Sequence, residues 1–186
     1  MKFHFLLFVV SCFAIACQSS NNSEEKIATA TTYNADQIDW TIPVPADWEY
    51  VPIDSTDRED EIIDLLHIKK NEVNTLSATI EPFDPLEFDM SWTTYNRLVK
   101  EMIYESYQKD GFSVDTSASR IVTVDGQPFE MYHIDLSQNN EPYAQQVLFG
   151  AFINDLDFNV VLTSTEEKTL ADMKALFLKS TFGTTN

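Results

Sequence analysis

Apolar and polar residues alternate along several short segments of the chain, which is the pattern of β-strands with one buried face. In residues 38–44 every second residue is apolar, whereas residues 145–153 are apolar on both faces and must be covered on both sides. Residues 62–69 also fit a helix, but the turn-prone residues that follow favour a hairpin with the next strand. Strands are therefore predicted at 38–44, 62–69, 76–80, 121–124, 127–136, 145–153 and 158–162.

Residues 91–109 have apolar side chains spaced three and four apart, as in an amphipathic helix. Asp110-Gly111 is expected to end this helix, because glycine readily adopts the left-handed conformation of a helix C-terminus. The side chains predicted to face inward are Tyr95, Leu98, Val99, Met102, Ile103 and Ser106.

A second helix is predicted to start at a capping box of Ser164 and Glu167 and to end near Phe182-Gly183. Its inward residues are Leu170, Met173, Leu176 and Phe177. Turns at Asp125-Gly126 and Asn154-Asp155 join neighbouring strands. The predicted fold is α+β, an antiparallel β-sheet flanked by helices, in one globular domain at 36–186.

The N-terminus predicts a targeting signal. Residues 3–16 are almost entirely apolar but shorter than the roughly 20 residues of a spanning helix, so residues 1–16 are interpreted as a signal peptide. The segment Ala14-Ile15-Ala16-Cys17 resembles the lipobox of bacterial lipoproteins, with Ala14 where leucine is usual. That resemblance implies cleavage between Ala16 and Cys17 and acylation of Cys17, for example with palmitate. Plain secretion is the alternative, since Ala14 and Ala16 also fit an ordinary cleavage site.

Residues 17–35 are predicted to form the lipidated cysteine and a flexible tether. They are rich in Ser, Asn, Thr and Ala and have no apolar periodicity, and such a coil spans about 20–25 Å. We expect a lipid anchor in a bacterial membrane, the outer membrane being favoured. The acidic pair Glu24-Glu25 leaves both the periplasm and the cell surface open, because such residues direct some lipoproteins outward.

The charge of the chain excludes whole classes of partner. With 30 Asp and Glu against 12 Lys and Arg, the net charge is −18. Nothing in such a chain would neutralise a run of phosphates, so nucleic acid is excluded as a partner, as is a polybasic membrane contact. The only cysteines are Cys12 and Cys17, so the domain itself has no disulfide and no thiolate chemistry.

Four segments together resemble PsbP-like domains, a family that includes a subunit of the photosynthetic oxygen-evolving complex and many bacterial lipoproteins. The matching segments are 40–48 (WTIPVPADW), 125–128 (DGQP), 159–165 (NVVLTST) and Phe177 with 180–182 (STF). The resemblance implies an α/β/α sandwich and a binding or accessory role, and it carries over no catalytic residues.

Candidate chemistry is sparse along the chain. His67 and His133 both lie in predicted strands and are interpreted as half-buried sheet histidines. Neither a nucleophile elbow nor a glycine-rich phosphate loop occurs among the four glycines. We therefore expect no catalytic residues, no cofactor and no enzyme activity.

Two features are candidate binding sites. The acidic run 54–64 offers Asp57, Asp60, Glu61 and Asp64 as cation ligands, although it lacks the glycine and spacing of an EF-hand and is better interpreted as a solvated loop. Tyr104 lies on the charged side of the helix 91–109, where an exposed aromatic side chain is a candidate partner contact. Trp40 and Tyr95 are predicted to be structural.

These observations favour a non-enzymatic, lipid-anchored cell-envelope protein that binds another envelope protein or assists a complex. The alternative is a protein that binds a small ligand or a cation through the acidic run. A hydrolase, which needs two facing carboxylates or a buried base in a cleft, is the third hypothesis.

Overall fold

The computed structural model describes residues 31–52 and 62–183. Its elements, in chain order, are β1 (Thr31–Ala35), η1 (Asp36–Ile38), β2 (Trp40–Val44), β3 (Glu49–Tyr50), β4 (Ile63–Asn71), β5 (Asn74–Pro82), α1 (Pro85–Phe88), α2 (Trp92–Lys109), β6 (Ser113–Thr116), β7 (Arg120–Val124), β8 (Gln127–Gln138), β9 (Glu141–Ile153), β10 (Leu156–Ser164), α3 (Glu167–Phe177) and β11 (Thr181–Phe182).

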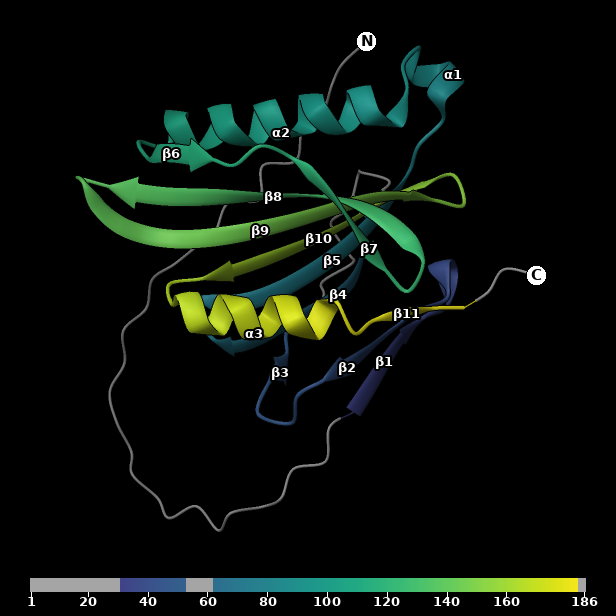
Figure 1. The fold of residues 1–186 in the computed structure, drawn as a ribbon, viewed down its shortest axis with the longest axis horizontal. Helices are drawn as coiled ribbons and strands as arrows, with labels where there is room; N and C mark the ends of the chain where they lie inside the picture. Colours follow the sequence, from purple (N-terminus) through teal and green to yellow (C-terminus); the bar gives the residue numbers. More distant parts are fainter. Residues whose placement is uncertain (1–30, 53–61, 184–186) are drawn as a thin grey trace.

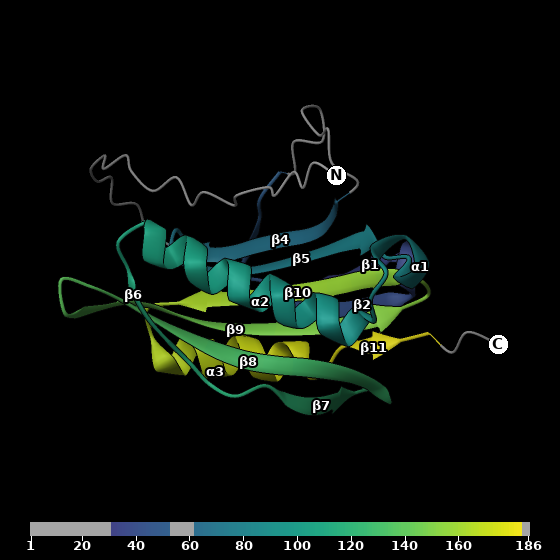
Figure 2. The ribbon, with the colours of Figure 1, turned by 90° about the horizontal axis from the view of Figure 1, so that it is seen from above.

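An eight-stranded antiparallel sheet forms the centre of the fold. Its strand order is β3-β4-β5-β10-β9-β8-β6, and β7 pairs with the other end of β8. Helix α2 covers one face and α3 the other (Figure 1), and Figure 2 shows α2 crossing the strands obliquely. The predicted α+β arrangement, an antiparallel sheet flanked by helices, is confirmed.

Two-residue turns with positive φ join the strands β7 to β10, which is the backbone that tight hairpins require. The predicted turns at 125–126 and 154–155 are confirmed, with φ of 46° and 83° in the first and 51° and 61° in the second. A third turn of this kind, at Asn139-Asn140, joins β8 to β9.

The face of the large sheet under α3 holds the main core, which is rich in aromatic rings. Phe177 of α3 lies 4.5 Å from Phe149 and 5.3 Å from Phe129 between ring centroids, and Trp40 lies 5.2 Å from Phe158. The predicted inward residues of the last helix are confirmed: Leu170, Met173 and Phe177 are buried, and Leu176 packs against them.

The opposite face carries a smaller cluster under α2. Its buried members are Tyr132, Ile134, Leu136, Ala144 and Leu148. Residues of α2 such as Ile103 and Tyr107 pack against them. Strand β9 is therefore covered on both faces, as its sequence predicts.

The folded domain begins earlier in the chain than the predicted residue 36. Thr31–Ala35 was assigned to the tether but is strand β1, paired antiparallel with β2 from Thr31↔Val44 to Ala35↔Trp40. The segment is held by tertiary contacts that composition does not reveal, since Ala35 is buried and the Tyr33 hydroxyl donates a hydrogen bond to the Leu65 carbonyl. Strand β2 belongs to a separate three-stranded sheet, β1-β2-β11, and not to the large sheet.

The boundaries predicted for the last helix are wrong at both ends. Its N-cap is Glu166 and not Ser164, which is still in β10. The Ser164 hydroxyl donates to Asn74 Oδ1 at 2.6 Å and accepts from the Glu166 N–H, so it ends the strand instead of capping the helix. The helix ends at Phe177, because the chain then turns to place 181–182 in β11.

The helix predicted at 91–109 is confirmed as α2, with Ser91 as N-cap and Gly111 at φ 86° after its end. Five of the six residues predicted to face inward are partly buried, but Met102 is 36% exposed, and the buried residue of α2 is Asn96. The helix is thus docked through a polar side chain, which a search for apolar periodicity does not find.

Candidate functional site

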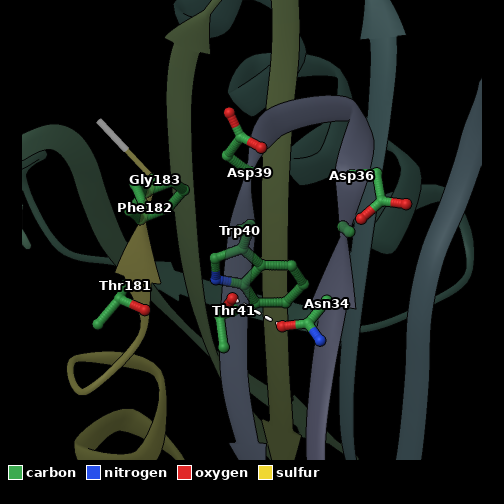
Figure 3. A pocket seen from close by; sticks show the side chains of 9 residues that line it. Asn34, Asp36, Asp39, Trp40, Thr41, Thr181, Phe182 and Gly183 are labelled. Atoms are coloured by element: carbon green, nitrogen blue, oxygen red, sulfur yellow. Dashed lines mark hydrogen bonds between the residues drawn. The ribbon is translucent and has the colours of Figure 1, made fainter. Parts of the chain in front are cut away.

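A groove lies where the first and last strands of the described chain meet on β2 (Figure 3). It has a volume of about 300 Å³. Its lining consists of Asn34, Ala35, Asp36, Asp39, Trp40, Thr41, Thr181, Phe182 and Gly183. The cross-strand neighbours Asn34, Thr41 and Thr181 bring one side chain from each strand of the small sheet.

The backbone around Asp39 shapes one end of this groove. Asp39 has φ 49°, which lets the chain turn from η1 into β2, and its carbonyl accepts the Gly183 N–H at 2.8 Å. A Cβ on residue 183 would lie 2.9 Å from Asp39 Cβ, so only glycine fits there. The exposed carboxylates of Asp36 and Asp39 flank the groove. They give it a negative charge suited to cationic or hydroxyl-rich ligands.

A second polar arrangement lies beneath α2, around Asp157 of β10. Asp157 is 2% exposed and accepts hydrogen bonds from Trp92 Nε1 at 2.7 Å and Asn159 Nδ2 at 2.8 Å. Across the strands it pairs with Glu81 of β5. Burial, with the nearby Glu81 carboxylate, raises the pKa of Asp157 to about 6, although the two hydrogen bonds act in the opposite direction.

Other polar contacts extend this arrangement along α2. The Tyr95 hydroxyl donates to Glu81, and burial together with that carboxylate raises the pKa of Tyr95. Asn96 donates to Glu130 at 2.8 Å, and Tyr107 donates to Gln146 at 3.0 Å. Because the partners of these side chains are within the protein, the arrangement positions the helix and does not present an open catalytic group.

Gly150 of β9 makes the close approach of α2 possible. A Cβ at this position would lie 3.1 Å from Asn96 Oδ1 and 3.3 Å from Asn159 Oδ1. Both amides are held by hydrogen bonds to carboxylates, Glu130 for the first and Asp157 for the second. A larger residue at 150 would therefore push against side chains that have little freedom to move.

The sequence-predicted binding residues do not meet at either place. Tyr104 is on α2 but is half-buried, and its role as a partner contact stays a prediction. Asp64 lies in β4, while Asp57, Asp60 and Glu61 fall outside the described residues. Ala16 and Cys17 fall outside them too. No group of three or more His, Cys, Asp or Glu that could hold a metal ion occurs within 31–52 and 62–183.

The two histidines are half-buried in strands, as predicted. His67 lies in β4, where burial lowers its pKa and the positive charge of Lys69 lowers it further. His133 lies in β8, where burial lowers its pKa and the neighbouring Lys174 and Arg120 act in the same direction. The residues that sequence reasoning missed are Asn96 and Asp157. One signal was available in the sequence. Strand β9 is apolar on both faces, and Asp157 lies in the adjacent strand β10 on the face opposite Phe158 and Val160.

No family model and no curated protein matches the sequence. Among solved structures, the chain is similar to cyanobacterial PsbP (CyanoP) from Synechocystis sp. PCC 6803, with a TM-score of 0.59 and 12% identity over 85% of this chain and 92% of that one. A protein of unknown function from Pseudomonas aeruginosa gives 0.40, with 10% identity over 78% of this chain and 89% of that one. LpqN of Mycobacterium tuberculosis, involved in cell envelope biogenesis, gives a TM-score of 0.39, with 17% identity over 85% of this chain and 92% of that one.

The likeness to CyanoP shows that the fold is PsbP-like, as the four sequence segments implied. At 12% identity this likeness concerns the fold alone. No helix within the described ranges is long and apolar enough to cross a membrane.

Proposed function

We propose that the chain is a lipid-anchored protein of the bacterial cell envelope whose PsbP-like domain binds another protein and has no enzymatic activity of its own. The anchor is Cys17, with cleavage after Ala16, and the outer membrane is the favoured location. Thirteen residues, 18–30, separate Cys17 from the first strand, so the domain would stay close to the membrane surface. What supports the binding role is the shape of the α1 turn.

Leu86 of α1 is 90% exposed, more than any other large apolar residue of the described chain. It stands on a short helix that is fixed at both ends. The Asp84 side chain accepts the Leu86 N–H at 2.8 Å, Pro85 sets the first helical φ, and Asp89 ends the turn in the left-handed conformation.

The turn is also anchored from below, because the ring of Phe88 stacks on the buried Phe83 at 5.1 Å. An apolar side chain held in water on a rigid support loses little entropy when it enters a pocket of a partner. The exposed acids Glu87 and Asp89 flank it. These features fit a partner protein with an apolar pocket and a basic rim, with Tyr104 as a proposed further contact.

Site-specific photo-cross-linking in intact cells tests this proposal. A photoreactive residue at position 86 should give one reproducible adduct, which Glu87→Lys with Asp89→Lys abolishes. Position 121 is the matched control, because Ile121 is also exposed, at 68%, but lies on β7. Equal cross-linking from positions 86 and 121, or none from 86, would contradict the proposal. A Tyr104→Ala change that leaves the adduct intact would remove Tyr104 from the contact.

The groove on the small sheet favours a second candidate function, the binding of a small polar or cationic ligand between Asp36 and Asp39. Calorimetric titration of Ca²⁺ into the full chain, and into Asp36→Asn with Asp39→Asn, tests the cation form. Heat that disappears in the variant would support this function, and no heat in the wild type would dispose of it. We do not favour a hydrolase, because the buried Asp157 carboxylate is already engaged by Trp92 and Asn159.

A further inference from the structure

Most edge strands of the two sheets are protected against pairing with another chain. A bare edge strand accepts a strand from outside, and proteins prevent this with charged residues, very short strands or covering groups. In the large sheet, β3 has only two residues, β6 contains Asp115 and β7 begins with Arg120. In the small sheet, the Asp125 carboxylate accepts the Phe182 N–H at 2.8 Å and so blocks the outer edge of β11.

Strand β1 is the exception. Its sequence, Thr-Thr-Tyr-Asn-Ala, has no charge and no proline, and it pairs with β2 without a bulge. It is an outer strand of the small sheet (Figure 1), and the residues Thr32 and Asn34 are exposed. Within 31–52 and 62–183, no backbone hydrogen bond joins β1 to a segment other than β2.

The strand register shows which backbone groups of β1 form its outer edge. Along an antiparallel strand, the N–H and C=O groups of successive residues point to alternate sides. The Asp39 carbonyl accepts the Gly183 N–H, so it points toward β11, and Pro43 in β2 points the same way. Pro43 agrees with this assignment, since it has no N–H to donate to its register partner Thr32. The N–H and C=O groups of Thr32 and Asn34 therefore face away from β2.

The groove next to this edge indicates the charge of a segment that fits there. Asp36 and Asp39 follow β1, and their carboxylates flank the groove of about 300 Å³ (Figure 3). Its lining residues in the described chain include no Lys or Arg. A strand added antiparallel to β1 has its N-terminal end beside these two acids, where a basic side chain is attracted. A second copy of this chain is a poor occupant, because a net charge of −18 repels an identical chain.

We propose that the outer edge of β1 binds an extended segment of another protein, which pairs antiparallel with β1 and places a basic side chain between Asp36 and Asp39. Backbone hydrogen bonds to Thr32 and Asn34 supply the affinity, and the two carboxylates supply the preference for a basic segment. This interaction uses the small sheet alone, so it does not depend on the contact proposed at Leu86. It differs from the binding of a free ligand in the groove, because the occupant is part of a protein strand.

Amide hydrogen exchange of the full chain, followed by NMR in a neutral detergent, tests the free edge first. The amides of Tyr33 and Ala35 should exchange slowly, whereas those of Thr32 and Asn34 should exchange rapidly. The probe is then a blocked peptide of alternating valine and threonine, with arginine as its second residue. At a concentration ten times its Kd, this peptide should slow exchange at Thr32 and Asn34 about tenfold.

Two variants of Thr32 isolate the contribution of the backbone. Thr32→Pro replaces the outward N–H with the proline ring and leaves the bonds to β2 in place, so the peptide should no longer bind. Thr32→Val keeps the N–H and should bind the peptide as the wild type does. Slow exchange at Tyr33 in both variants shows that β1 is still paired with β2. Asp36→Asn combined with Asp39→Asn should weaken binding about fivefold, as expected for exposed ion pairs.

Five results would each overturn the proposal. Slow exchange at Thr32 and Asn34 in the free chain at every concentration would mean that the edge is already covered. Slow exchange that appears only at high protein concentration would assign the edge to a second copy. The third result is no response of β1 amides to the peptide at millimolar concentration, and the fourth is binding that Thr32→Pro leaves unchanged. Equal affinity for a peptide with glutamate in place of arginine would reject the basic segment. None of these results bears on the contact at Leu86, which photo-cross-linking tests separately.

Discussion

The two faces of the large sheet are each covered by one helix, but the contacts that hold the helices differ in kind. Under α3 the contacts are between rings such as Phe149 and Phe177, which gain free energy from burial. Under α2 the contacts with the shortest distances are hydrogen bonds, for example Trp92 to Asp157. Packing of apolar rings supplies stability but is not directional. Hydrogen bonds are directional, so they fix the position of the helix, and those to a carboxyl group depend on its protonation state.

The largest effect is expected on the α3 face. Phe177→Ala should lower the free energy of unfolding by about 3–5 kcal/mol, because it removes a fully buried ring and leaves a cavity among Phe129 and Phe149. Leu178→Ala is the control, since Leu178 is the next residue and is 39% exposed. Urea denaturation of the full chain measures both. A loss at 178 equal to that at 177 would mean that α3 does not hold the core.

The α2 face should show the stronger dependence on pH. The pKa of Asp157 is raised to about 6 in the folded protein, from 3.8. The stability that comes from this shift is therefore fully present below about pH 4 and is lost as pH rises through 6. The variant Asp157→Asn has no such loss. The difference in free energy of unfolding between this variant and the wild type should therefore change by about 3 kcal/mol between about pH 4 and pH 6.

Urea denaturation at a series of pH values from 4 to 8 measures this difference. Asp172→Asn, an exposed acid on α3, serves as the control and should keep the pH profile of the wild type. If Asp157→Asn keeps that profile as well, the carboxylate is not the source of the pH dependence, and the contrast between the two faces is smaller than the geometry indicates.

A smaller effect should come from packing on the α2 face. Gly150→Ala places a Cβ against Asn96 and Asn159 and should cost about 1–2 kcal/mol, since both amides are held by hydrogen bonds. Combined with Asn96→Ala, which opens space, the two changes should cost less than the sum of their separate effects. Additive losses in this double-mutant cycle would show that the helix yields easily at this point.

The contrast between the faces also explains what the sequence could reveal. Residues such as Leu170 and Phe177 follow an apolar helical spacing, and hairpin turns such as Asp125-Gly126 have a local signature, so both were predictable. Asn96 and Asp157 are polar, and a pattern analysis places polar residues outward, although here they are buried. Met102 is the reverse case, since its apolar side chain fits the helical spacing but is 36% exposed.

The candidate sites depend on contacts between distant segments, which no local pattern encodes. The groove forms where Asn34, Thr41 and Thr181 become neighbours in the small sheet. The predictions at Ala16 and Cys17, by contrast, rest on a local motif outside the described residues, and they stay predictions.

The pairing of β11 with β2 has a consequence for how the chain folds. Thr181 pairs with Thr41, so this contact closes a loop of about 140 residues, and loops of that length make folding slow. During synthesis the small sheet lacks its third strand until residues 181–182 have been made. The contact of β11 with β2 is therefore a late step in folding, and deletion of residues 181–182 would remove it.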